Sequence, residues 1–216
     1  MARLLKSVEV GQYEIHPTLQ QGHREWFDEH RFLRYENAKP IIQKRRIATQ
    51  RITGVDDRLR VVATIIDPPT YFADSTNSIA LSPGAPCRLE YLLGLLNSRL
   101  TQWRFKITST NNNVGTNELD SLPFRRINFS DPADKARHDA MVRKVDAMLE
   151  AKQQLAKAKT DKDKTYYERK CADLDRQIDR LVYDLYGLTQ EEIQIVEQQA
   201  KPAPPVPRQE SQRSLL

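Results

Sequence analysis

The strongest catalytic candidate in the sequence is a four-residue string, Asp67-Pro68-Pro69-Thr70, which follows the apolar run 59–66. An acidic or amide side chain followed by two prolines and an aromatic residue can hold the amino group of an extruded nucleobase for methyl transfer, while the ring stacks on the base. Here position 70 is threonine, and the nearest ring, Tyr71, is displaced by one residue. The string therefore lacks the side chain that would stack on the base.

Methyl transfer also requires a site for S-adenosylmethionine, usually a glycine-rich turn that lets the backbone approach the cofactor. The seven glycines are scattered, no Gly-x-Gly occurs, and no alternation of strands and helices surrounds Asp67. The sequence instead predicts that the two prolines end the strand 59–66 at a sheet edge or a turn.

The sequence also lacks the residue patterns of a nuclease or of a metal site. A nuclease needs clustered carboxylates and a lysine to hold Mg²⁺ and a water molecule. Glu-x-Lys occurs at Glu150/Lys152 and Glu168/Lys170, but both pairs lie in predicted helices without an acidic partner. The four histidines and two cysteines show no metal-ligand spacing. We therefore predict no catalytic residues and no metal site, and the chain taken alone does not look like an enzyme.

Composition indicates a soluble chain. Charged residues make up 29% of the 216 positions, and no run reaches the roughly 18 apolar residues that a membrane span needs. The first residues show no apolar core followed by a cleavage site, so a secretory signal is not expected. We expect a cytoplasmic protein with one domain, an appendage and no membrane partner.

The basic charge is concentrated in the first part of the chain. Up to Ile127 there are 18 Lys and Arg against 13 Asp and Glu, a net charge of +5, whereas the remainder holds 16 of each. Residues 39–60 alone contain seven basic and two acidic side chains. Such a patch suits a polyanion, although charge alone equally describes a solvated surface.

The first part, 1–127, is expected to be a mixed αβ domain. The alternation in 47–53 and the β-branched residues of 59–66 flank a Gly-Val-Asp-Asp turn and predict a hairpin, with 78–82 as a third strand. Leucines at three- and four-residue steps predict one helix over 88–105, in which Gly94 could allow a close backbone approach. The polar stretch 108–127 is long enough to be functional or disordered.

The second part, 128–198, is expected to be helical. Two apolar stripes separated by 160–165 predict an antiparallel coiled-coil hairpin with its tip near Asp161. Gly187 should end the second helix, and Thr189 with Glu192 should cap a third. The Pro-rich tail, 199–216, is expected to be disordered. The predicted fold class is thus α+β: a small β-sheet packed by a helix, followed by the hairpin.

Several segments, in order, resemble one known family. They are QRIT (50–53), YFADSTNSIAL (71–81), EYLLGLLNSRL (90–100), the Asn-rich loop ending in Leu122-Pro123, and RQIDRLVYDLYGLTQEEIQIVE (176–197). The set is similar to the TaqI-like C-terminal specificity (target recognition) domain of adenine-specific DNA methyltransferases, especially type IIG restriction-modification enzymes and related phage-defence methylases. Phe124 stands where an aliphatic residue is usual. The resemblance covers about residues 30–197.

This resemblance implies a module that grips duplex DNA, reads base edges and helps to present an extruded adenine to a methyltransferase domain. That domain is absent from this sequence, so the chain resembles a remnant, a separate subunit or an excised piece. No cofactor is expected in this chain, and S-adenosylmethionine and Mg²⁺ belong to the missing domain or partner.

The candidate DNA contacts fall into two groups. Basic side chains suited to phosphates are Lys44, Arg45, Arg46 and Arg51. Side chains at a helix end and loop that could reach a groove are Arg104, Lys106, Thr108, Ser109, Asn111, Asn112, Asn113 and Thr116. An asparagine run also forms turns well, so some of these residues are expected to make no contact with DNA.

Two other interpretations stay open. The helical hairpin could serve as an assembly module that docks on a methyltransferase subunit or forms a homodimer, with no base reading by the αβ part. RNA binding is disfavoured, because most aromatic residues lie in apolar patterns rather than on a stacking platform.

Overall fold

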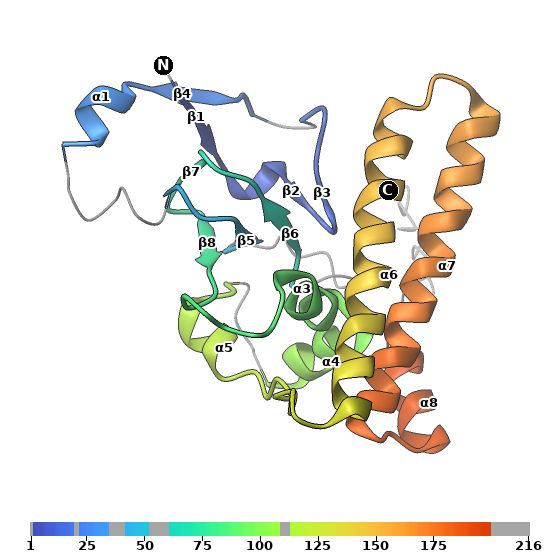
Figure 1. Ribbon diagram of the computed structural model, residues 1–216. Coiled ribbons are helices and arrows are strands. Elements are labelled where there is room, and N and C mark those ends of the chain that lie inside the picture. The colour runs from blue at the N-terminus through green and yellow to red at the C-terminus, as the bar shows by residue number, and fades with distance from the viewer. Residues whose placement is uncertain (1, 20–21, 35–41, 52–60, 109–112, 200–216) are drawn as a thin grey trace, which may run out of the picture.

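The computed structural model describes residues 2–19, 22–34, 42–51, 61–108 and 113–199, and it has an α+β fold (Figure 1). Small sheets and short helices form one part, and two long helices stand beside it as a hairpin. The predicted fold class is confirmed. Within the described ranges, no helix is long and apolar enough to cross a membrane.

The central sheet has the strand order β6–β5–β8, and both pairs of neighbours are antiparallel. The strands, in that order, are Ala63–Ile66, Arg46–Gln50 and Thr76–Ile79. The predicted antiparallel pair of strands and the third strand are therefore confirmed. The third strand begins two residues and ends three residues before the predicted 78–82, and the predicted turn at 54–57 lies outside the described residues. The chain turns at 67–70 before the short strand β7 (Tyr71–Phe72), as the two prolines predict.

The N-terminal residues add strands that the sequence did not reveal. β1 pairs with β4 and β7 in a second sheet, while β2 and β3 form a small hairpin. These elements are β1 (Ala2–Leu5), η1 (Ser7–Glu9), β2 (Val10–Gly11), β3 (Glu14–Ile15), β4 (Glu25–Phe27) and the short helix α1 (Glu29–Phe32). The strands are too short to show a clear alternation in the sequence.

The predicted helix 88–105 is two helices, α3 (Leu89–Asn97) and α4 (Arg99–Thr108). Ser98 is extended, with ψ of 152°, and interrupts the helix. Two acceptors satisfy the N-terminus of α4: the Ser98 hydroxyl accepts from the Thr101 N–H at 3.3 Å, and the Asp179 carboxylate accepts from the Arg99 N–H at 2.9 Å. The polar stretch that follows contains a short helix, α5 (Thr116–Asp120).

The hairpin consists of α6 (Pro132–Lys157) and α7 (Asp161–Tyr186). The connection between the two helices lies at 158–160, next to the predicted tip at Asp161. The Thr160 hydroxyl accepts from the Asp163 N–H at 3.1 Å and caps α7, so residues 161–165, which separate the two apolar stripes, belong to this helix. Gly187, at φ 66°, ends α7 as predicted. Thr189 and Glu192 form the expected capping box before α8 (Gln190–Gln199).

The hairpin packs against the αβ part through α3. A Cβ at Gly94 would lie 2.7 Å from the Met141 sulfur and 3.0 Å from a Val145 methyl, so the predicted close approach is confirmed. Residues of α3, α6, α7 and β6 share one apolar core. The predicted division at residue 127 thus lies between a mixed αβ part and a helical part that are packed together.

A second junction joins α7 to the start of α4 through Asp179, which is 3% exposed. Its other carboxylate oxygen lies 3.0 Å from Arg99 Nε. Burial and the nearby Asp175 and Glu197 outweigh the contacts with Arg99 and raise the pKa of Asp179 to about 7. In the folded protein, the protonated and ionised forms of Asp179 are therefore both populated near neutral pH.

This shift predicts that Asp179 weakens the fold as the pH rises. The unfolded chain releases this proton near pH 4 and the folded chain near pH 7, so the contribution to stability falls between those values. Asp179→Asn keeps an acceptor for the Arg99 N–H and carries no charge. We expect urea unfolding to show a gain of about 2 kcal/mol at pH 8 and little gain at pH 4. The exposed Asp184→Asn should keep the pH dependence of the unchanged protein, and an equal gain at both pH values would contradict the prediction.

Candidate nucleic-acid interface

The described end of β5 brings an exposed arginine next to the Asn-rich segment. The Arg51 N–H donates to the Ser75 carbonyl at 2.9 Å, and the Arg51 carbonyl accepts from the Val114 N–H at 2.7 Å. The Arg51 side chain is exposed, and among the described residues it donates to the Asp74 carbonyl at 3.1 Å. Its backbone is therefore fixed, while its guanidinium has donors left for a ligand.

Asn77 fixes the segment that follows the loop. Its side-chain amide is buried and donates to the Val114 carbonyl at 2.7 Å and to the Thr49 hydroxyl at 3.2 Å. Asn113 and Thr116, on either side of Val114, are exposed. We call Arg51, Asn113 and Thr116 the β5-end surface, because hydrogen bonds fix the backbone of Arg51 and of Val114, which lies between the other two in the chain.

Two chain segments outside the described residues are next to Arg51 and Asn113 in the sequence. Residues 52–60 follow Arg51 directly, and residues 109–112 precede Asn113 directly. Three of the predicted contacts, Ser109, Asn111 and Asn112, lie in the second segment, outside the described residues.

Two further basic candidates lie at the opposite end of β5. Lys44 and Arg45 precede the strand and Arg51 follows it, so roughly 20 Å of extended chain separates them, at about 3.3 Å per residue. Lys44 is exposed. Arg45 is bound to Asp67 at 3.1 Å and to Glu90. The predicted phosphate contacts therefore do not form one cluster.

Arg46 requires a correction, because it is 3% exposed. Its guanidinium donates to the Thr70 carbonyl and lies 4.3 Å from the centre of the Phe72 ring. Burial lowers its pKa. The arginine supports the turn between β6 and β7 and is not placed to contact a phosphate.

The remaining candidates lie on α4. Arg104 and Thr108 are exposed and Lys106 is half-buried. The Thr108 hydroxyl donates to the Arg104 carbonyl at 2.8 Å. α4 packs on α3, α7 and α8, and its buried Gln102 bonds the backbone of Val61 just before β6. We therefore treat these three side chains as a group of their own, apart from the β5-end surface.

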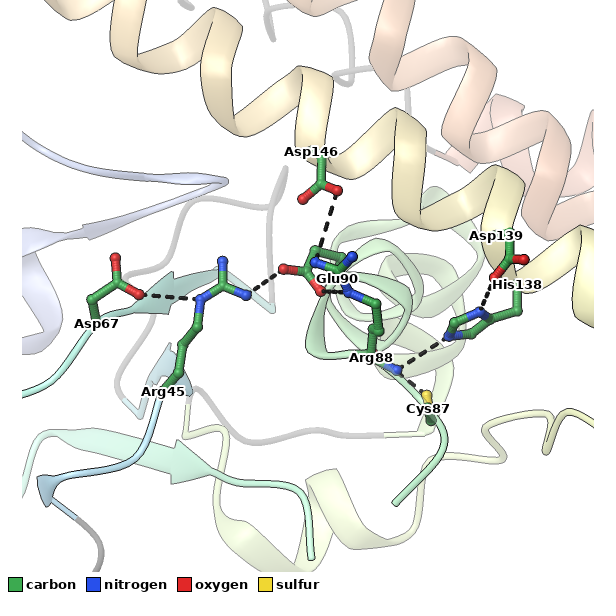
Figure 2. Close-up of polar contacts among 8 residues, drawn as sticks. All are labelled: Arg45, Asp67, Cys87, Arg88, Glu90, His138, Asp139 and Asp146. Atoms are coloured by element: carbon green, nitrogen blue, oxygen red, sulfur yellow. Dashed lines mark hydrogen bonds and ion pairs between the residues drawn. The ribbon is translucent and has the colours of Figure 1, made fainter. Parts of the chain in front are cut away.

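A cluster of ionised groups around Glu90 is the other site at which chemistry could be sought (Figure 2). Glu90 is 1% exposed and is bound by Arg45 and Arg88. Burial favours the neutral acid, but hydrogen bonds from the two arginines outweigh it and lower the pKa of Glu90. The cluster neutralises a buried carboxylate and joins the start of α3 to β5, which is a structural task.

Cys87, His138 and Asp139 lie beside this cluster in an arrangement that suggests a nucleophile and a base (Figure 2). However, His138 Nε2 accepts from the Arg88 N–H at 3.1 Å, so it cannot take a proton from a thiol. Its Nδ1 faces the Asp139 carboxylate at 2.9 Å. Burial and the nearby Glu90 raise the pKa of the Cys87 thiol to about 11. This group therefore lacks both a thiolate and a free base.

Sequence reasoning missed two residues that build the β5-end surface. Asn77 lies inside the 71–81 segment that carried the family resemblance, so a signal for it existed. No sequence signal pointed to Ser7. Its hydroxyl accepts from the Arg51 N–H at 3.2 Å and donates to the Ser75 carbonyl. Among the described residues, no group of three or more His, Cys, Asp or Glu side chains could hold a metal ion.

No family model and no curated protein matches this chain. Among solved structures, it is similar to part of the type IIL restriction-modification enzyme MmeI in complex with DNA, with a TM-score of 0.49 and 13% sequence identity. The match covers 72% of this chain and 21% of that enzyme. This chain thus spans about a fifth of the length of that enzyme.

Proposed function

We propose that this chain is a sequence-specific duplex-DNA recognition module of a restriction-modification or phage-defence adenine DNA methyltransferase. It positions the target for a methyltransferase domain that lies outside this sequence and that binds S-adenosylmethionine. The observation that carries the proposal is the β5-end surface, where the side chains of Arg51, Asn113 and Thr116 are exposed. The backbone of Arg51 and of Val114 is fixed there by hydrogen bonds. Arginine can bind phosphate or guanine, and asparagine can pair with adenine.

The arrangement of the family-like segments supports this proposal. The segment 50–53 contributes Arg51, the segment 71–81 contributes Asn77, and the Asn-rich loop contributes Val114, and hydrogen bonds join these three segments. Residues that are far apart in the sequence thus meet at one surface of polar and basic side chains.

The assembly alternative is weaker. The stripe that would form a seam with a partner, Ile178, Leu181 and Leu185, packs in the core of this chain. Ile178 and Leu185 are fully buried there, so this face of the hairpin is not free to dimerise. Light scattering should therefore give the mass of a monomer for the isolated chain.

Arg51→Gln should weaken binding to every duplex. Losing one phosphate contact lowers the slope of log affinity against log salt concentration by about 0.9. Fluorescence anisotropy across a salt series measures both quantities. Arg31→Gln, an exposed arginine on α1, should leave the slope unchanged. A slope unaffected by Arg51→Gln would remove this residue from the interface.

Recognition of a particular DNA sequence by the protein requires a separate measurement. The unchanged protein should enrich one motif from a pool of random duplexes, and Asn113→Ala should relax the preference at one position while largely keeping the affinity for unrelated DNA. Tight binding without enrichment of any motif would reject base reading.

A further inference from the structure

A hollow on the helical hairpin gathers positive side chains from both long helices. It has a volume of about 390 Å³, and its lining includes Lys144 of α6 together with Tyr166, Arg169 and Lys170 of α7. We call these four residues the hairpin hollow. The hollow lies on the helical part of the chain and shares no residue with the β5-end surface.

The cations of the hollow have no acidic partner in the part of the chain that the structure describes. Within the described ranges, Lys144, Arg169 and Lys170 make no ion pair; Lys170 only approaches the ring of Tyr167, at 6.0 Å. The one acid in the lining, Asp173, is bound to Arg176. The hollow therefore carries uncompensated positive charge, although the second part of the chain is neutral as a whole.

Tyr166 completes the site as an exposed hydrogen-bond donor. Its side chain is 59% exposed, and its ring stands edge-on to Tyr167 with 5.0 Å between centroids. Positions 166, 169 and 170 lie on one face of α7, because residues three and four apart are neighbours on a helix. A phenol and several ammonium or guanidinium groups around a shallow hollow suit the oxygens of a phosphate.

We propose that the hairpin hollow binds phosphate groups of the DNA backbone, as a contact additional to the β5-end surface; the nature of the ligand rests on the proposed function. Contacts with phosphates contribute affinity and orientation without reading sequence. An acidic peptide would offer similar charges. It is disfavoured because the lining provides only Leu174 and the exposed ring of Tyr166 as apolar anchors.

The test uses the full chain and two matched triple variants. Lys144→Gln/Arg169→Gln/Lys170→Gln removes the charges of the hollow. Lys157→Gln/Lys159→Gln/Lys162→Gln removes three exposed charges near the hairpin tip that make no ion pair in the described chain. Thermal unfolding followed by circular dichroism verifies that both variants fold. Affinity for a mixed-sequence duplex is then measured by anisotropy over a series of salt concentrations.

We expect the hollow variant to lower the salt slope by about two to three, since each phosphate contact contributes about 0.9, and the tip variant to change it little. An unchanged slope in the hollow variant overturns the inference, and if Arg51→Gln still lowers the slope, the proposed function survives. Equal changes in both triple variants also overturn it, because they indicate a general effect of charge. If the unchanged protein binds no duplex, both proposals fail.

Discussion

The free energy of unfolding of an Asn97→Leu variant should be about 3 kcal/mol lower than that of the unchanged protein. Asn97 is 2% exposed, and its side-chain amide bonds both polar groups of Ala63: it accepts from the N–H at 3.1 Å and donates to the carbonyl at 3.0 Å. Leucine has nearly the same size but no polar atoms. The Ala63 N–H would then be buried without a partner, which costs about 1–3 kcal/mol beyond the lost hydrogen bonds.

The large effect of changing Asn97 is expected because β6 is an edge strand of the central sheet. Among the described strands, β6 pairs with β5 alone, and on its other side the Tyr13 N–H donates to the Ala63 carbonyl at 3.0 Å. Gln102 bonds both polar groups of Val61, at 2.9 and 2.7 Å, just as Asn97 bonds those of Ala63 two residues along the chain. Two side-chain amides thus replace a neighbouring strand. The break at Ser98 lets the end of α3 and the start of α4 present them together.

Urea unfolding measures the loss, and hydrogen exchange locates it. The Ala63 amide should exchange faster in Asn97→Leu, while amides of α6 should change only as much as the global stability does. Asn117→Leu, at an exposed position on α5, provides the matched control and should alter stability by less than about 0.5 kcal/mol. A loss below about 1 kcal/mol in Asn97→Leu would show that the sheet edge is satisfied in another way.

Local chemistry made part of this structure predictable. The hairpin of β5 and β6, the capping box at Thr189 and the helix end at Gly187 each depend on residues close together in the sequence. Gly94 was recognised as a point of close approach because a glycine within a leucine-rich helix has few other uses. These features require no knowledge of tertiary contacts.

Other features depend on partners that are distant in the sequence. Arg46 looked like a surface cation because three basic residues run together, yet the β6–β7 turn and Phe72 bury it. The break at Ser98 depends on Asp179, which lies 80 positions from its partner Arg99 in the chain. A sequence pattern cannot show that an acid on a later helix will cap an earlier one.

The family-like segments also have a structural explanation. Within EYLLGLLNSRL, Glu90 forms ion pairs with Arg45 and Arg88. Gly94 lets α6 pack closely against α3, and Asn97 bonds the backbone of β6 at the edge of the sheet. These are tasks of folding rather than of recognition. The residues of the β5-end surface lie instead next to a strand end and at the start of a helix, where their side chains are exposed.

Gly94→Val should lower the free energy of unfolding by about 3 kcal/mol, because α3 and α6 cannot move apart without losing packing in the core. A Cβ would lie 2.7 Å from the Met141 sulfur and 3.0 Å from a Val145 methyl, and a valine adds two more carbon atoms in that space. Met141 and Val145 are both buried in the core, so neither can swing into solvent. Overpacking of a well-packed core costs about 1–3 kcal/mol, and a β-branched residue is at the upper end.

A double-mutant cycle identifies the cause. If the clash with Met141 is responsible, Met141→Ala should cost less in the Gly94→Val background than in the unchanged protein, because the smaller side chain makes room for valine. The coupling should be about 1–2 kcal/mol in favour of the double variant. Simple addition of the two losses would instead locate the strain in the backbone of α3. Since α3 also carries Asn97, a displaced α3 should expose the Ala63 amide to exchange as well, which links the packing of the hairpin to the integrity of the sheet that holds the β5-end surface.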